Sequence, residues 1–354
     1  MTIIYFLLLL TVIVCIHEFG HLIAAKIFGV YCYEYSFGMG PALVQKRFGE
    51  TIYSLRAVPI GGFVSLAGEK DGDETYPDVH VPEGRRLTDQ KPWKRIIILL
   101  AGVTMNFLLA WVLFSLTILS QGQYAVSPKA VIAEVVAGSP AEQAGLLPGD
   151  KVLQITREDG SSVKPETYFD MQVFLADAAD QPARYRISRN GEELSFEIAA
   201  AYDAESDRYL IGIVGSSPEV IQVNALNCWK YGAVEMRSIA GMMLTTIKRL
   251  FTGRGLDQLS GPVGIYNVTE QYVSLGFSYY ILLMAELSLN VGIFNLLPLP
   301  VLDGGQVILT IGEWIAGKPL NEKVRYALMI GCWVILLALM VFVTWNDISR
   351  LVFG

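Results

Sequence analysis

The sequence predicts a polytopic α-helical membrane protein that carries an inserted water-soluble α/β domain. Of its 354 residues, 53% are hydrophobic and 17% are charged, a balance that suits several membrane spans plus a soluble part. Four segments are long and apolar enough to cross a bilayer, which takes about 20 residues. They cover residues 3–28, 96–119, 277–297 and 326–345. The net charge of −7 argues against nucleic acid as a partner.

The first span, within residues 1–29, has a cleaved signal peptide as its alternative reading. Ala24-Ala25 offers small residues for cleavage, but only Met1-Thr2 stands where a signal peptide has its basic region. We therefore expect an uncleaved span.

The same span contains the pentapeptide His17-Glu18-Phe19-Gly20-His21. On a helix, His17 and His21 stand four residues apart and project from one face, so both rings can reach one metal ion. Two histidines in an ordinary core are the alternative, but imidazole and carboxyl groups are costly at bilayer depth and usually mark a site there. The motif predicts a metal site, with Glu18 near enough to move a proton of a metal-bound water.

Basic residues predict the orientation of the spans. The segment 30–95 ends with Lys91, Lys94 and Arg95 next to the second span, and the connection 305–325 holds Lys318 and Lys323. Both segments are therefore expected in the cytoplasm, with residues 120–276 and both termini outside.

The cytoplasmic segment 30–95 is expected to form membrane-associated β-hairpins. Residues 35–65 are rich in glycine, aromatic residues and alternating patterns, which is typical of strands with turns. Residues 69–84 are acidic and rich in turn formers, which predicts an exposed loop with His80 on its surface.

Residues 120–205 change to a soluble α/β pattern. Strands are expected at 131–136, 151–155, 183–189 and 193–199, and Asn190-Gly191 signals a hairpin between the last two. Ser139 and Pro140 are suited to the N-cap and first position of a short helix. With SPAEQAGLLPGDKVLQI, this order resembles a PDZ domain, which implies a peptide-binding or gating module.

The following stretch, 206–276, contains an amphipathic pattern at residues 229–251. A helix lying at the outer membrane surface is the expectation, and a packed soluble helix is the alternative.

A third metal ligand is needed, because catalytic zinc sites use three protein ligands and leave one position for water. Asp303 is the candidate, within the third predicted span segment, 277–304, where Pro298 and Pro300 break the helix and Gly304 lets the chain turn inward. His17 should lie about 22 Å into a hydrocarbon core of about 30 Å, near the cytoplasmic side to which the third span delivers Asp303. The four cysteines show no paired spacing that would indicate a zinc site or a disulfide framework.

HEFGH in the first span, NLLPLPVLDGG after the third, a glycine-rich β segment and the PDZ-like insertion together resemble the site-2 protease family. The nearest type is the bacterial group that cleaves anti-sigma factors within the membrane, and QLSGPVGI (258–265) also looks like that group. The resemblance implies a Zn²⁺ protease with His17, His21 and Asp303 as ligands and Glu18 as catalytic base. It further implies that Asn295 helps to hold the substrate, although an Asn that caps the helix end is an alternative.

The resemblance also implies partners and a location. The substrate would be a single-span membrane protein, either an anti-sigma factor or a signal-peptide remnant. The protein would be a multi-pass protein of the bacterial inner membrane, embedded in the lipid bilayer, with the PDZ domain extracytoplasmic.

Three features depart from the family or have no assigned role. Gln306 stands where members of the group often carry His, Glu286 lies inside the third span, and a single PDZ-like domain is visible where some relatives have two. Two rival functions are a catalytically silent binding protein and a zinc transporter. The retained Glu18 speaks against the first, and the soluble domain speaks against the second.

Overall fold

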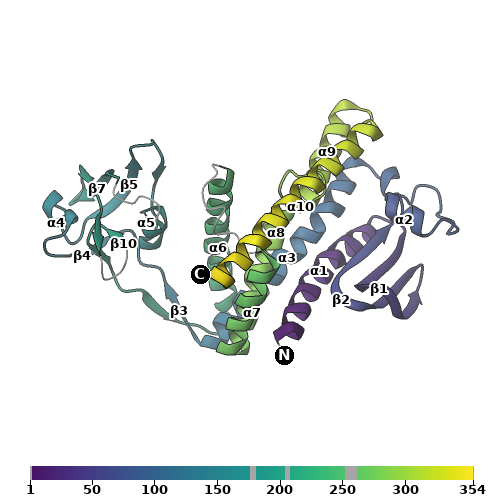
Figure 1. Ribbon diagram of the computed structural model, residues 1–354, viewed down its shortest axis with the longest axis horizontal. Helices are drawn as coiled ribbons and strands as arrows, with labels where there is room; N and C mark the ends of the chain where they lie inside the picture. The colour runs from purple at the N-terminus through teal and green to yellow at the C-terminus, as the bar shows by residue number, and fades with distance from the viewer. Residues whose placement is uncertain (1, 176–180, 204–207, 252–260, 354) are drawn as a thin grey trace. The chain divides into compact units, whose positions relative to one another are not determined.

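The computed structural model describes residues 2–175, 181–203, 208–251 and 261–353. The chain divides into two compact units, which we call the helical unit (residues 1–121 and 224–354) and the inserted unit (residues 122–223). Figure 1 shows the helices of the first and the small sheets of the second.

Among the described residues, four helices of the helical unit are long and apolar enough to cross a membrane: α1 (Thr2–Ile27), α3 (Pro92–Gln121), α8 (Phe277–Asn295) and α10 (Glu322–Phe353). The four predicted spans are therefore confirmed as helices. The third ends two residues earlier than expected, ahead of Pro298, because the residues before a proline are biased away from helical geometry.

The core of the helical unit lies where α1 and α3 contact α8. Leu9 and Ile13 of α1 pack with Leu283 and Met284 of α8, and all four are nearly inaccessible to solvent. A second cluster joins Ala110, Phe114, Ala285 and Leu289. Polar residues of α1 and α3 next to these clusters are thereby held in a protein interior, even though the helices themselves are apolar.

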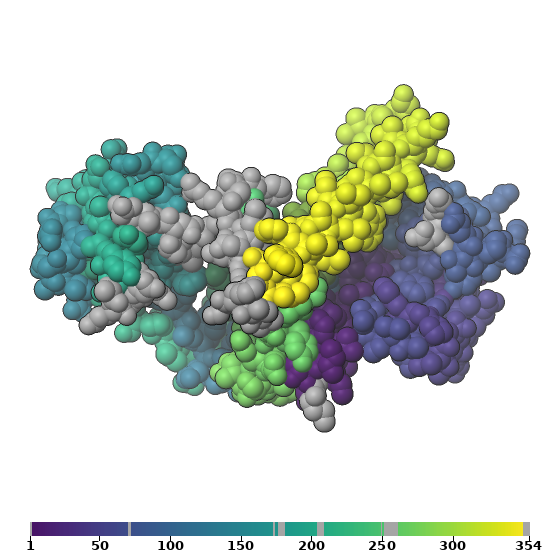
Figure 2. Space-filling model, viewed as in Figure 1, coloured from purple at the N-terminus to yellow at the C-terminus, as the bar shows by residue number. Residues whose placement is uncertain are grey.

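Helix α10 lies on the near face in Figure 2, where many of its large apolar side chains are exposed. Among them are Trp333, Val334, Ile335 and Val341. A long helix with such a surface suits contact with lipid. Near its end, Asp347 accepts hydrogen bonds from the backbone N–H groups of Gly261 and Gly264, at 2.9 and 2.8 Å, at the start of helix α7 (Pro262–Leu275).

Two long strands, β1 (Cys32–Phe48) and β2 (Thr51–Leu66), replace the several short strands expected in residues 35–65. Both strands bend, and the register shifts repeatedly along them. As a result residues 34–37 of β1 pair with residues 52–55 of β2 on one side and with residues 62–65 on the other. The segment 62–66 therefore forms one edge of this sheet.

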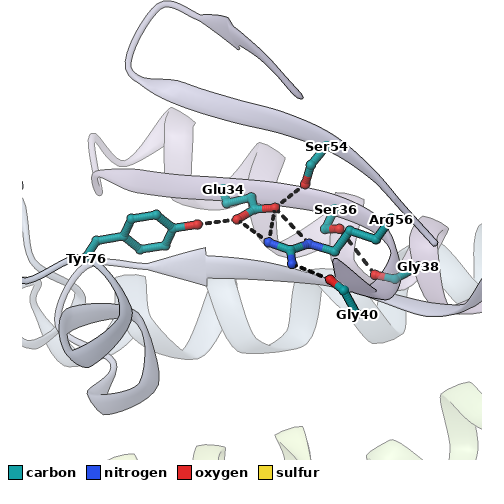
Figure 3. Close-up of polar contacts among 7 residues, drawn as sticks. All are labelled: Glu34, Ser36, Gly38, Gly40, Ser54, Arg56 and Tyr76. Atoms are coloured by element: carbon teal, nitrogen blue, oxygen red, sulfur yellow. Dashed lines mark hydrogen bonds and ion pairs between the residues drawn. The ribbon is translucent and has the colours of Figure 1, made fainter. Parts of the chain in front are cut away.

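A buried polar network fixes the sheet (Figure 3). Glu34 is fully buried and receives hydrogen bonds from Ser54, Tyr76 and Arg56, whose Nη1 also donates to the carbonyl of Gly40 at 2.6 Å. Burial raises the pKa of Glu34, but these hydrogen bonds and the guanidinium charge outweigh it and hold the pKa below its ordinary value. The carboxylate is thus a structural anion that ties the two strands together.

Tyr76 belongs to the acidic stretch 69–84, which was expected to be an exposed loop. The structure instead forms a short helix there, α2 (Lys70–Thr75), and Asp73 accepts a hydrogen bond from Tyr33 Oη at 2.8 Å. The prediction of a loop was wrong for this part because tertiary hydrogen bonds to the sheet stabilise a stretch with weak local preference. A single 3₁₀ turn, Leu87–Asp89, then leads into α3.

The connection 305–325 is also more regular than predicted, because helix α9 (Asp303–Ala316) occupies most of it. Glu313 of α9 forms ion pairs with Arg95 of α3 at 3.5 Å and Arg325 of α10 at 3.4 Å. Gly304 and Gly305, which predicted a bend in the chain, lie in the first turn of helix α9.

Helix α6 (Cys228–Phe251) covers the amphipathic pattern 229–251. Its Met236, Ile239 and Met243 pack against the cluster formed by α3 and α8, which covers part of its apolar face. Trp111 Nε1 of α3 donates to the carbonyl of Trp229 at 2.9 Å. In the family-like segment QLSGPVGI, residues 258–260 lie outside the described residues.

The inserted unit contains a four-stranded antiparallel sheet in the order β6-β5-β7-β8, with β5 (Lys151–Arg157), β6 (Ser162–Val163), β7 (Ala183–Arg189) and β8 (Glu192–Ile198). Helices α4 (Pro140–Ala144) and α5 (Tyr168–Leu175) accompany it. Asn190 and Gly191, both with positive φ, form the predicted hairpin turn. Ser139 accepts the predicted N-cap bond from the N–H of Glu142 at 3.3 Å.

Three two-stranded ladders complete the unit. They pair β3 (Gln123–Val126) with β12 (Glu219–Gln222), β4 (Ile132–Val135) with β11 (Ile213–Gly215), and β9 (Ala201–Asp203) with β10 (Arg208–Leu210). The unit therefore extends to Val223 rather than ending at 205, because its last strands return to pair with its first.

Candidate metal centre

Three potential metal ligands from distant parts of the chain meet in the helical unit. Asp303 Oδ2 lies 3.0 Å from Nε2 of His17 and 3.6 Å from Nε2 of His21, and the two Nε2 atoms lie 3.2 Å apart. Both histidines are buried, and the Asp303 side chain is 17% exposed. Within the described residues, these are the His, Cys, Asp and Glu side chains placed to share one ion.

Helix α1 presents both imidazoles on its buried face because they stand one turn apart. Helix α3 leaves room for them at Gly102. A methyl group at this position would come within 2.4 Å of His21 Nε2 and 2.8 Å of His17 Cε1. The absent side chain thus forms part of the cradle around the ligand atoms.

Asp303 reaches the histidines through the loop between α8 and α9. The N-terminal turn of α9 packs closely on this loop, since a methyl group at Gly305 would come within 2.0 Å of the carbonyl oxygen of Leu299. Gln306 donates a hydrogen bond to the carbonyl of Pro300. Gln306, whose role was open in the sequence, therefore stabilises the loop that delivers Asp303.

The three ligands fit a zinc ion. Zn²⁺ binds nitrogen and oxygen ligands at about 2.0–2.2 Å in a tetrahedron, which separates neighbouring ligand atoms by about 3.4 Å. The distances between the three ligand atoms here, 3.0, 3.2 and 3.6 Å, are close to this separation of about 3.4 Å. Asp303 Oδ2 is buried and makes no hydrogen bond among the described residues, so three electron-rich atoms face one another as a cation requires.

The outer nitrogens of the imidazoles also have partners. His21 Nδ1 lies 2.8 Å from the carbonyl oxygen of Ile98, and His17 Nδ1 lies 3.3 Å from Nδ2 of Asn106. Neither partner was predicted from the sequence. Asn106 carries the single carboxamide between residues 96 and 119, so the cost of a polar group at that depth could have identified it.

A cavity of about 250 Å³ opens beside the three ligands. It is lined by two of them, His17 and Asp303, together with Glu18 and Asn295. Apolar side chains complete the wall: Val14, Val291, Val301 and Leu302. The structure thus brings four of the five predicted site residues to one cavity, with His21 adjoining them.

Strand β2 lies against helix α1 on the side that carries Thr11, Cys15 and Glu18. Glu18 Oε2 accepts a hydrogen bond from the backbone N–H of Val64 at 3.1 Å. Thr11 donates to the carbonyl of Pro59 at 2.6 Å, and Cys15 donates to that of Gly61 at 3.6 Å. Three hydrogen bonds therefore join side chains of α1 to the backbone of β2, one of them at Glu18. The sequence did not predict this contact between strand and helix.

Other candidate residues lie apart from this group. His80 is exposed, as predicted, and Glu286 is half-buried on α8. The four cysteines are free and buried.

A buried pair of histidines and an aspartate, placed beside a carboxylate and a cavity among membrane-length helices, defines a membrane metallohydrolase site. Comparison with known proteins agrees. The model of peptidase family M50 matches residues 5–339, and the chain belongs to this family, which is the site-2 protease family.

Relatives match over nearly the whole chain. The chain is 30% identical to the zinc metalloprotease RasP of Shouchella clausii and 30% identical to the regulator of sigma-W protease RasP of Bacillus subtilis, with 99% of both chains covered in each case. It is 34% identical to the putative zinc metalloprotease CPE1693 of Clostridium perfringens, with 98% of each covered. The protein is a multi-pass membrane zinc metalloprotease of the site-2 type.

Proposed function

We propose that the protein hydrolyses a peptide bond within or near the transmembrane segment of a single-span membrane protein. In this proposal His17, His21 and Asp303 hold Zn²⁺, and Glu18 is the general base. The observation that carries it is the convergence of the three ligand atoms beside a cavity that Glu18 and Asn295 also line.

Bound zinc would lower the pKa of its water toward about 7 and polarise the scissile carbonyl. The Glu18 carboxylate takes the proton from the attacking water and passes it to the nitrogen of the leaving amine. The N–H of Val64 donates to Oε2 of Glu18, which restricts the orientation of the carboxyl group. Val14 and Val291, among the apolar wall residues, limit the access of bulk water to the reacting groups.

Asn295 contributes to substrate binding. Its half-buried side chain, at the last residue of α8, lines the same cavity as Asp303. Its amide either fixes an extended substrate backbone or supports the developing oxyanion, both of which require a donor facing the scissile bond.

The sheet of β1 and β2 receives the substrate as an added strand. A helix hides its peptide bonds in its own hydrogen bonds, so cleavage requires local unwinding, and pairing with a sheet edge stabilises the unwound strand. The edge segment 62–66 is the nearest candidate, because its Val64 N–H reaches Glu18.

The inserted unit is a PDZ-like module on the extracytoplasmic side of the bacterial inner membrane. The strand–helix order, the Ser139 cap and the Asn190-Gly191 hairpin support the PDZ-like assignment. Basic residues next to the spans support the orientation. The unit screens substrates, so that cleavage within the membrane follows a first cut outside.

The substrate class is an anti-sigma factor or a signal-peptide remnant. The Bacillus subtilis relative is named as a regulator of sigma-W, which supports the first of these. A proteomic comparison of membrane fragments between wild-type and Glu18→Gln cells tests the proposal. Single-span proteins should accumulate in the variant as stubs cut on the outer side, and their absence would contradict the proposed function.

The two rival functions make different predictions. A silent binding protein would give the same fragments in both cells. A zinc transporter would change the zinc content of the Glu18→Gln cells without accumulating stubs.

A further inference from the structure

Asn106 is a buried polar side chain that directly contacts the predicted metal centre but has no place in the proposed mechanism. It is fully buried on α3, one turn beyond Gly102. Its Nδ2 lies 3.3 Å from Nδ1 of His17, and its Oδ1 is buried without a hydrogen-bond partner among the described residues.

The ligand geometry determines which nitrogen of each imidazole carries the proton. Both Nε2 atoms face Asp303 Oδ2, so each needs a free lone pair there to bind a metal, and the proton must then reside on Nδ1. For His21 this is satisfied, because Nδ1 faces the carbonyl oxygen of Ile98, which can only accept.

For His17, the orientation of the Asn106 amide determines which ring nitrogen carries the proton. The nitrogen and oxygen of a carboxamide are assigned from their hydrogen-bond network, and in the orientation described Oδ1 is the atom left unpartnered. With nitrogen toward the ring, His17 Nδ1 would accept a hydrogen bond from the amide, and Nε2 would carry the ring proton, directed at Asp303. With oxygen toward the ring, Nδ1–H donates and Nε2 is free for the metal.

We propose that Asn106 is a positioning residue that accepts a hydrogen bond from His17 Nδ1–H through Oδ1 and so fixes the metal-binding tautomer of His17. Asn106 then does through a side chain what the Ile98 carbonyl does for His21. This inference rests on the proposed zinc site.

The fold is suited to hold this amide in place. Ser288 of α8 donates a hydrogen bond to the backbone carbonyl of Asn106 at 2.9 Å, and Ser288 is itself fully buried. Asn106 is thereby fixed between α1 and α8, two helices that carry residues of the site. Outer partners of this kind typically contribute 10- to 100-fold to metal affinity.

The test measures Zn²⁺ affinity of the purified full-length protein by competition with a chromophoric chelator. Asn106→Leu keeps the approximate volume but removes the acceptor, and we expect affinity to fall about 10- to 100-fold. Asn106→Asp supplies an acceptor and no amide donor, and we expect affinity within a few-fold of wild type. Thr117→Val, which removes a buried hydroxyl elsewhere on α3 whose hydrogen bond goes to the carbonyl of Leu113, is the matched control and should bind zinc as the wild type does.

Wild-type affinity in Asn106→Leu would overturn the inference. So would an equal loss in Asn106→Leu and Asn106→Asp, since that pattern indicates a donor or a packing role; the Asp variant decides the question even if the Leu variant does not fold. His17→Ala separates this inference from the proposed function. If that variant retains zinc, the proposed metal centre itself is wrong, whatever Asn106 does.

Discussion

Two buried carboxylates, one in each unit, differ in what surrounds them. In the inserted unit, Asp150 is 1% exposed and receives hydrogen bonds from Arg189 Nε and Nη2, both at 2.7 Å, and from the N–H of Leu147 at 2.9 Å. In the helical unit, Oδ2 of Asp303 is buried, makes no hydrogen bond among the described residues and faces two imidazole nitrogens. The first is a structural ion pair, and the second has the arrangement expected of metal ligands.

The difference shows how to separate structural from functional polar groups inside a protein. A buried anion whose acceptor sites are filled stabilises the fold, whereas a buried anion that faces other lone pairs needs a cation. Glu18 is intermediate, since one backbone N–H holds it and the rest of its carboxyl group faces a cavity.

The largest expected effect comes from removing Asp303. Asp303→Ala should weaken Zn²⁺ binding by more than about 100-fold, because it deletes a ligand rather than an outer partner. Metal content of the purified protein measures this. Asp150→Asn is the matched control and should retain full zinc. Equal zinc content in all three proteins would remove the distinction between the two carboxylates.

The reverse experiment addresses stability. Asp150→Asn should speed amide hydrogen exchange of β5 and β7 by roughly 10- to 100-fold, because it leaves Arg189 partly buried without its charge partner. Asp303→Ala should leave exchange in these strands unchanged. Hydrogen exchange followed by mass spectrometry of the full chain gives both values, and protection of β5 in Asp150→Asn equal to wild type would show that the pair is dispensable.

The same pair predicts a pH dependence. Burial raises the pKa of Asp150, but the hydrogen bonds from Arg189 and Leu147 outweigh it and hold the pKa below its ordinary value. Its stabilisation is therefore complete above the ordinary Asp pKa of about 4 and is lost as the pH falls through the lower native value. The protection factor of the β5 amides, which corrects for their slower intrinsic exchange in acid, should fall only below about pH 4 in the wild type, and this acid dependence should weaken in Asp150→Asn. An unchanged acid dependence in the variant would assign it to other carboxyl groups.

The intermediate case, Glu18, can be tested through its backbone partner. Val64→Pro removes the N–H that donates to Glu18 Oε2, and we expect cleavage to fall about 10- to 100-fold with zinc binding retained, because the base loses its orientation. Val44→Pro, in the exposed part of β1, controls for general damage to the sheet. An equal loss in both variants would contradict a specific role for the Val64 N–H.

The smallest effect concerns the inserted unit as a whole. Deleting residues 122–223, the bounds set by the pairing of β3 with β12, should leave zinc binding intact and allow cleavage of uncut substrate, which we expect the wild type to leave mostly intact. An immunoblot of full-length and pre-cut substrate measures this. Continued dependence on the first cut after deletion would count against a screening role.

The sequence was sufficient for those parts of the site that follow from local periodicity or from the cost of polar groups in lipid. Helical spacing placed His17 beside His21, and the helix-breaking prolines indicated that Asp303 could turn inward. The order of strands and turns predicted the sheet around Asn190-Gly191. In each case the determining interactions are close in the chain or are set by the membrane.

The parts that were missed depend on contacts between distant residues. Helix α2 forms where Tyr76 and Asp73 bond to the sheet, and β11 and β12 extend the inserted unit because their partners lie about 80–100 residues earlier. Likewise, the partners of the imidazoles come from α3, and nothing near His17 in the chain indicates Asn106. Tertiary hydrogen bonds of this kind leave little trace in local sequence patterns.

The central claim is that a zinc ion bound by His17, His21 and Asp303 acts together with Glu18 in cleavage. Zinc content and cleavage of a single-span substrate, measured in parallel on purified wild-type and Glu18→Gln proteins, test it most directly. The account predicts one equivalent of zinc in both proteins and a loss of cleavage by at least about 100-fold in the variant. Normal cleavage by Glu18→Gln would contradict the account.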